Sequence, residues 1–95
     1  KSVLMQIKYT AHYLRKLEDL LNQSNYVLRY EKGNFKSGYC ILRDTCLVIV
    51  NKYYTLEGKI NCLLEIIRQL DIDPEKLSAK QQKMLAELLE ISTPL

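Results

Sequence analysis

The sequence predicts an α+β domain with an N-terminal helix, a three-stranded antiparallel sheet and two C-terminal helices packed on one face. Three observations lead to this prediction. Residues 2–22 contain no Gly or Pro and repeat apolar side chains at helical spacing, residues 48–50 form a β-branched run typical of a strand buried on both faces, and residues 55–70 are again apolar at helical spacing. Because 95 residues suffice for one hydrophobic core, residues 1–95 are predicted to form a single domain.

The first predicted helix covers Ser2 to Asn22, and the polar residues 23–25 indicate its end. Glu18 interrupts the apolar spacing where a core residue is due, and three heptads are too few to predict a coiled coil. A homodimer through this helix is an alternative to a monomer. The predicted apolar stripe consists of Leu4, Ile7, Ala11, Leu14, Leu17 and Leu21.

Three strands are expected in the middle of the chain. Alternating side chains predict a half-buried strand from Tyr26 to Glu31, with its polar side facing water, and a hairpin follows with strands Gly38 to Leu42 and Thr45 to Asn51. Arg43 and Asp44 fit a two-residue turn, but neither is Gly, so a connection of three to five residues is an equal alternative. The hairpin register and the strand order therefore stay open.

The second predicted helix, Thr55 to Leu70, is expected to be the most buried element. Thr55 is a good N-cap residue. Gly58 costs about 1 kcal/mol relative to Ala in a helix, which is outweighed if a strand or an aromatic ring packs against it. Cys62 and Ile66 extend the apolar stripe, so this helix can contact the sheet and neighbouring helices at once.

A last helix is predicted up to about Ile91. Pro74 follows an Asp and is placed to open a new turn. Ser78 and Gln81 have the spacing of a capping box, which indicates where the last helix starts.

Charge is spread unevenly over the chain. The net charge is +3, with +2 in residues 1–23, +3 in residues 24–59 and −2 in residues 60–95. A module dedicated to duplex nucleic acid normally carries a stronger basic stripe, so nucleic-acid binding is a secondary hypothesis. No apolar run is long enough for a membrane span or a signal peptide, and we expect a cytoplasmic protein with no membrane contact.

No catalytic or metal motif is intact in the sequence. Cys40, Cys46 and Cys62 lack C-x-x-C spacing and sit in apolar segments, so we expect reduced, buried thiols. His12 is the single histidine and has no ligand-type residue at short spacing. We therefore predict no cofactor, no bound zinc and no enzymatic activity.

Two resemblances accompany this interpretation. The run Val48 to Asn51, followed by the helix around Ile60 to Glu65, resembles the strand-to-helix passage of ImmA/IrrE-type zinc metallopeptidases. That family carries H-E-x-x-H on the helix, whereas the matching positions here, 64–68, keep the glutamate and lack both histidines. The resemblance implies a shared supersecondary plan without peptidase activity. The passage from Tyr30 to Leu64 also resembles short uncharacterised bacterial proteins.

The predicted working surface joins the loop after the first strand to the junction between the third strand and the second helix. In a simple meander both segments emerge at the same end of the sheet. This end then brings together cations, aromatic rings, loop glycines and a helix N-terminus. We expect a non-enzymatic interaction module with a protein partner, as a monomer or weak homodimer; a phosphate or single-stranded nucleic-acid binding module is the alternative, and a small-molecule enzyme comes third. The predicted binding residues are Lys32, Asn34, Phe35, Lys36, Lys52, Tyr53 and Tyr54.

Overall fold

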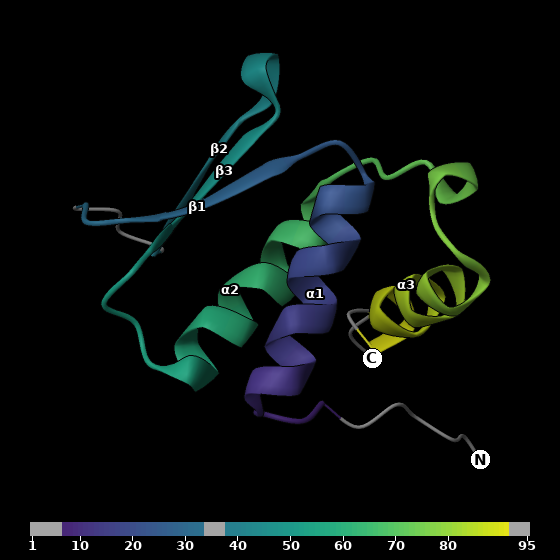
Figure 1. The fold of residues 1–95 in the computed structure, drawn as a ribbon, viewed down its shortest axis with the longest axis horizontal. Helices are drawn as coiled ribbons and strands as arrows, with labels where there is room; N and C mark the ends of the chain where they lie inside the picture. Colours follow the sequence, from purple (N-terminus) through teal and green to yellow (C-terminus); the bar gives the residue numbers. More distant parts are fainter. Residues whose placement is uncertain (1–6, 34–37, 92–95) are drawn as a thin grey trace.

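The computed structural model describes residues 7–33 and 38–91 of the chain (Figure 1). Its three helices and three-stranded sheet confirm the α+β class. In chain order the elements are α1 (Ala11–Gln23), β1 (Val27–Glu31), β2 (Tyr39–Leu42), a 3-10 turn (Arg43–Thr45), β3 (Leu47–Asn51), α2 (Leu56–Gln69), a second 3-10 turn (Pro74–Lys76) and α3 (Ala79–Ile91).

The sheet is mixed, so the prediction of a purely antiparallel sheet is wrong. The strand order is β1-β3-β2, with β1 parallel to β3 and β2 antiparallel to it. The register of the parallel pair runs from Val27 opposite Leu47 to Glu31 opposite Asn51. The most apolar strand thus takes the central position, where both of its edges are hydrogen-bonded, and the chain passes from one edge strand to the other between β1 and β2.

The β2–β3 connection is the longer of the two alternatives. Leu42 pairs with Leu47, and the residues between them form a 3-10 turn followed by Cys46 in the left-handed conformation, with φ 52°. A two-residue turn would have placed Ile41 opposite Cys46, but Ile41 pairs with Val48. Cys62 is buried, whereas Cys40 and Cys46 are half-buried, so the prediction of buried thiols is correct for Cys62 and wrong for the other two.

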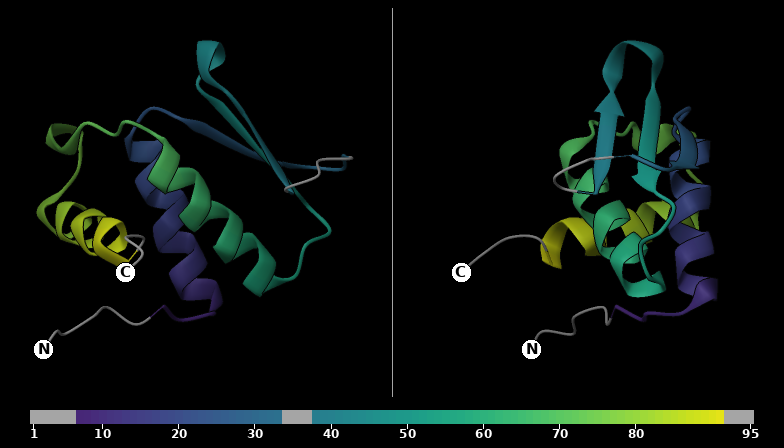
Figure 2. Two further views of the ribbon diagram at one scale, coloured as in Figure 1. Left: turned by 180° about the vertical axis from the view of Figure 1, so that it is seen from behind. Right: turned by 90° about the vertical axis from the view of Figure 1, so that its left-hand side faces the viewer.

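The helices are stacked on one side of the sheet in two layers. Figures 1 and 2 show α1 and α2 lying side by side against the sheet, with α3 on the far side of these two helices. The prediction that both C-terminal helices pack on the sheet face is therefore correct for α2 and wrong for α3. Val48 and Val50 are buried under α1 and α2, whereas Ile49 faces the other way and is half-buried, so β3 is not buried on both faces as predicted.

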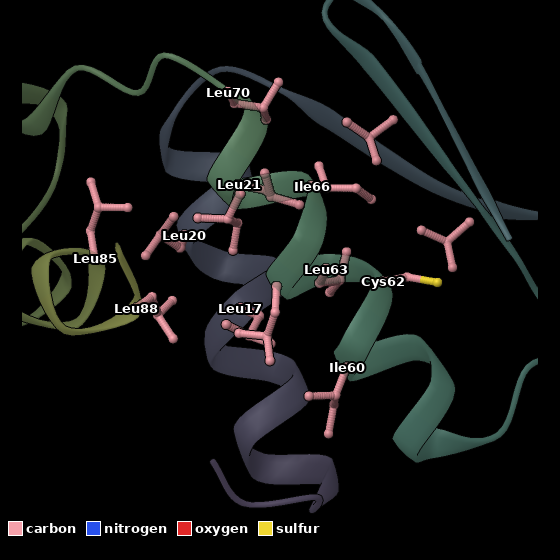
Figure 3. Close-up of a cluster of buried hydrophobic side chains, with 14 of the residues drawn as sticks. Leu17, Leu20, Leu21, Ile60, Cys62, Leu63, Ile66, Leu70, Leu85 and Leu88 are labelled. Carbon is pink, nitrogen blue, oxygen red and sulfur yellow. The ribbon is translucent and has the colours of Figure 1, made fainter. Parts of the chain in front are cut away.

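The hydrophobic core lies between α1, α2 and the inner face of the sheet, with α3 closing its far side (Figure 3). α2 supplies six of its buried side chains, in agreement with its predicted central position. Leu63 and Ile66 are completely buried where α2 passes α1. The fully buried side chains are Leu17, Leu20, Leu21, Val48, Val50, Ile60, Leu63, Ile66 and Ile67.

α1 begins later than predicted. Residues 7–10 are not helical, and the helix starts at Ala11 because the side chain of Thr10 caps it, accepting the N–H of Tyr13 at 3.1 Å. Ala11 is exposed, so it does not belong to the apolar stripe. The predicted helical residues 2–6 lie outside the described part of the chain.

The other predicted helix boundaries are confirmed. The Thr55 hydroxyl accepts the N–H of Gly58 at 3.1 Å at the start of α2. Asp73 caps the turn that contains Pro74. Ser78 and Gln81 exchange the two hydrogen bonds of a capping box before α3, at 3.0 and 3.2 Å.

Candidate functional site

One end of the sheet brings together segments that are distant in sequence. β1 and β3 both leave the sheet there, and β2 enters there. The N–H of Lys52 donates to the carbonyl of Glu31 at 3.0 Å, and the N–H of Asn51 donates to the carbonyl of Gly38 at 2.8 Å. Because β1 and β3 point the same way in either strand order, the shared end predicted from a meander also exists in the mixed sheet.

Tyr53 is the most exposed large apolar side chain in the described part of the chain, at 68%. Its N–H donates to the Asn51 side chain at 3.0 Å, which fixes the turn after β3. The Nζ of Lys52 lies 5.3 Å from the centre of its ring, within the range of a cation–π contact. Lys32, which leaves β1 at the same end, is exposed as well. This end therefore presents an aromatic ring with lysine side chains beside it.

Tyr54 has a different position from its neighbour. It is half-buried and packs against the core. Gly38 has φ +87°, and a Cβ on it would collide with the ring and hydroxyl of Tyr54. A Cβ on Gly58 would lie 3.0 Å from the same ring. Tyr54 is thus a wedge between two glycines that ties the start of α2 to the start of β2.

Of the seven predicted binding residues, the structure places Lys32, Lys52 and Tyr53 on the surface of this sheet end. It directs Tyr54 inward. Asn34, Phe35 and Lys36 lie outside the described residues.

A polar contact that the sequence did not reveal joins β1 to both helices. Tyr30, on the inner face of the sheet, donates its hydroxyl hydrogen to the carboxylate of Glu18 on α1. The Nζ of Lys59 on α2 lies 5.0 Å from the centre of the Tyr30 ring. Burial, followed by the hydrogen bond to Glu18, raises the pKa of Tyr30. Glu18 at a core-facing position of α1 was the available signal, because such a carboxylate needs a donor.

A second tyrosine makes a similar contact at the opposite edge of the sheet. The side-chain amide of Gln69 donates to the Tyr39 hydroxyl oxygen at 2.6 Å. Burial, followed by a hydrogen bond to Glu65, raises the pKa of Tyr39, and burial raises the pKa of Cys62 nearby. Groups held in their neutral form donate hydrogen bonds well but are poor bases and nucleophiles near neutral pH. These contacts fasten the sheet to the helices.

A groove of about 600 Å³ lies between α1 and α3. Its lining mixes charges of both signs, including Lys16, Asp19 and Glu87. Tyr13 also lines it, and within the described residues the buried Tyr13 hydroxyl has no hydrogen-bond partner. Burial, then the charge of Glu87, raises the pKa of Tyr13.

Residues 7–33 and 38–91 contain no group of three His, Cys, Asp or Glu side chains placed to hold a metal ion. His12 is exposed. Within the same residues, no helix is long and apolar enough to cross a membrane.

No protein-family model matches the chain, and comparisons with curated proteins and with solved structures find no significant match. At the two positions where ImmA/IrrE-type peptidases carry zinc-binding histidines, Leu64 is buried in the core and Arg68 is exposed.

Proposed function

We propose that the chain is a non-enzymatic protein-interaction module that binds its partner through the sheet end. The observation that carries this proposal is the exposed ring of Tyr53, which lies under Lys52 and takes no part in the core. Tyrosine combines a large rigid apolar area with a polar tip and is enriched among the residues that anchor protein interfaces. The proposed contact residues are Lys32, Lys52 and Tyr53, together with Asn34, Phe35 and Lys36, which follow Lys32 closely in the sequence.

The polar groups of the fold favour a binding module over an enzyme. Tyr30 and Tyr39 hold their hydroxyls in hydrogen bonds that fasten the sheet to α1 and α2. The sheet end offers lysines and an aromatic ring, which suit recognition better than proton transfer at neutral pH.

The alternative is a phosphate or single-stranded nucleic-acid binding module. It is favoured by the same ring and cations, since bases stack on exposed tyrosines and lysines neutralise phosphates. The N-terminus of α2 at Thr55 lies one residue beyond Tyr54 and adds a partial positive charge. Glu31 and Glu57 border the same region, which weakens the attraction for an anion.

The test is capture of partners from a native extract, after nuclease treatment, with wild type, Tyr53→Ala and Tyr9→Ala side by side. Tyr9 is another exposed tyrosine, at 43%, and serves as the matched control. If Tyr53 is an anchor, its loss should weaken binding of the captured partner by about thirtyfold, corresponding to about 2 kcal/mol. Tyr9→Ala should bind like wild type, and affinity should depend weakly on salt.

Equal recovery by Tyr53→Ala and wild type would contradict the proposed surface. Recovery that nuclease abolishes would support the alternative instead. In that case binding to a single-stranded oligonucleotide should fall steeply with salt, and Lys32→Ala and Lys52→Ala should each reduce the salt dependence.

A further inference from the structure

The groove between α1 and α3 contains a buried hydroxyl group that the fold does not use. Tyr13 lines this groove from α1, and its side chain is only 5% exposed. Among the described residues, none forms a hydrogen bond with the Tyr13 hydroxyl, which is also shielded from bulk water. A buried hydroxyl in this state lowers stability, because its bonds to water are lost and not replaced. Such groups are rare in folded proteins and need an explanation.

The Tyr13 hydroxyl is available as a donor on the side of α1 that lines the groove. Burial, and then the charge of Glu87 on α3, raise the pKa of Tyr13, so the hydroxyl keeps its hydrogen at neutral pH. Glu87 is half-buried and lines the same groove. A ligand atom that accepts the hydrogen of Tyr13 therefore also comes under the influence of a carboxylate.

Charges of both signs line the groove beside this hydroxyl. Lys16 lies one turn from Tyr13 along α1, and Lys83 lies one turn from Glu87 along α3. In the part of the chain that the structure describes, neither lysine forms an ion pair, and neither does Glu87. The lysines attract an anionic group, whereas Glu87 repels it and attracts a cationic one. A ligand that carries one group of each sign suits all of these side chains.

The capping box of α3 leaves further donors in the groove. Ser78 and Gln81 both line it, and each uses its side-chain oxygen to accept a backbone N–H. The hydroxyl hydrogen of Ser78 and the amide hydrogens of Gln81 remain as donors. The uncharged groups of the lining thus offer mainly donors, which match the carbonyl and carboxylate oxygens of a peptide.

We propose that this groove binds a small zwitterion, a molecule with one carboxylate and one ammonium group, such as a short peptide with free termini. Its carboxylate accepts hydrogen bonds from Tyr13 and a neighbouring lysine, and its ammonium group lies against Glu87. Met84 and the ring of Tyr13 provide apolar contact for its side chains. The volume of about 600 Å³ lies within the range of small-molecule sites.

Binding requires side chains of the lining to move, because the Tyr13 hydroxyl is shielded in the free protein. Met84 and the lysines are unbranched and have several rotatable bonds, so they can open the groove without a change of the backbone. Asp19 and Lys80, which also line it, add one charge of each sign. Neither sign therefore dominates the groove.

The test compares four forms of one dipeptide. Leucylleucine carries both charges, its N-acetyl form only the carboxylate, its amide only the ammonium group, and the doubly capped form neither. The free dipeptide should bind most tightly, and each single cap should raise the dissociation constant by about tenfold, because a contact to a charged group is lost. Titrations followed by ¹⁵N–¹H NMR measure these constants and should shift amides of α1 and α3.

Two variants separate ligand binding from folding. Tyr13→Phe should weaken binding of leucylleucine by about tenfold without lowering the free energy of unfolding, because the hydroxyl has no partner in the described fold. Tyr30→Phe, which removes a hydroxyl bonded to Glu18, should destabilise the protein instead. Glu87→Gln should weaken binding of the free dipeptide and of its amide, and leave the N-acetyl form unaffected or bound more tightly.

Two controls accompany these variants. Glu90→Gln removes the same charge from an exposed position of α3 outside the groove and should leave all four constants unchanged. Tyr53→Ala should also leave them unchanged, so this inference and the proposed function hold or fail separately.

The proposal is overturned if no form of the dipeptide shifts amides of α1 and α3 at concentrations up to about 10 mM. Equal dissociation constants for the free and the N-acetyl dipeptide would also overturn it. So would a Tyr13→Phe variant that loses as much stability as Tyr30→Phe, because the hydroxyl would then have a partner within the folded chain.

Discussion

At the scale of single residues, Tyr30 and Tyr39 fasten the sheet to the helices, whereas the Tyr53 side chain is exposed. Tyr30 lies on the inner face of β1, as its place in the alternating strand predicted, and Glu18 receives its hydroxyl hydrogen. Tyr53 has no comparable structural role, because it does not belong to the hydrophobic core. The difference between these two tyrosines is set by neighbours far away in sequence.

Alkaline pH should destabilise the protein through its buried acids. The pKa of Tyr30 is raised from its ordinary value of 10.0 by burial and by the hydrogen bond to Glu18. Tyr39 and Cys62 shift in the same direction, Cys62 from 9.0. Because the unfolded chain releases these protons first, the stability they contribute is complete below about pH 9 and falls as pH rises through 9 and 10. Urea unfolding between pH 7 and 11 measures this loss.

The Tyr30→Phe variant isolates the contribution of Tyr30 to the loss of stability with rising pH. At pH 7 it should lower the free energy of unfolding by about 1 to 2 kcal/mol, because a partly buried hydrogen bond to a carboxylate is lost. Its stability should then decline less steeply with pH than that of wild type. Tyr53→Phe, which removes an exposed hydroxyl, is the control; a slope in Tyr30→Phe as steep as that of the control would rule out this account.

At the scale of elements, local sequence signals predicted where helices begin and end better than they predicted which strands pair. The caps at Thr55 and Ser78 were predictable, because a cap depends on residues within one turn. The parallel pairing of β1 with β3 was not, since strand order depends on competition between whole strands for the central position. The start of α1 was missed because the apolar spacing continues back through Ile7, whereas the helix begins only after Thr10, whose side chain caps it by a hydrogen bond that spacing does not reveal.

The candidate site could be predicted only in part: its place at one sheet end was predicted, but the different positions of its two tyrosines were not. The shared sheet end followed from strand directions alone, so Lys32 and Lys52 were placed correctly. Tyr53 and Tyr54 could not be separated from sequence, because adjacent residues in a turn have no fixed alternation. The available signal for Tyr54 was Gly58, a helix glycine whose cost is outweighed if a strand or an aromatic ring packs against it, and the ring of Tyr54 is the group that does so.

A prediction at the scale of elements concerns the stability of the junction between β3 and α2. Tyr54→Ala should lower the free energy of unfolding by about 2 kcal/mol, less than for a fully buried aromatic, because the ring is half-buried. Gly58→Ala normally gains about 1 kcal/mol in a helix. In wild type this gain should be absent, since the new Cβ would lie 3.0 Å from the Tyr54 ring. In a Tyr54→Ala background part of the gain should return, because the ring is removed while Thr55 Oγ1 and the Cβ of residue 54 remain 3.3 Å from the new Cβ.

Urea denaturation of the four combinations gives the coupling between the two positions. The same Gly58→Ala change in a Tyr53→Ala background is the matched control and should show no gain. If Gly58→Ala stabilises wild type by the full helix-propensity difference, the wedge described for Tyr54 is wrong.

At the scale of the whole molecule, the layers differ in how firmly they are held. α2 contacts the sheet, α1 and α3, and supplies six buried side chains. α3 is separated from the sheet by the other helices (Figure 1), and its described buried side chains are Leu85 and Leu88. Local opening free energy follows the number of buried apolar contacts that an element must break.

Native-state hydrogen exchange should therefore find the amides of α2 and β3 most protected and those of α3 opening first. Leu88→Ala should accelerate exchange in α3 while leaving β3 nearly unchanged, because Leu88 belongs to the outer helix layer. Leu63→Ala, at the completely buried centre of α2, should lower protection in α1, α2 and β3 together and reduce the free energy of unfolding by about 2 to 5 kcal/mol. Mass-spectrometric exchange of peptides from each element measures both variants against wild type. Equal acceleration of all elements by Leu88→Ala would show instead that α3 unfolds as one cooperative unit with the rest of the molecule.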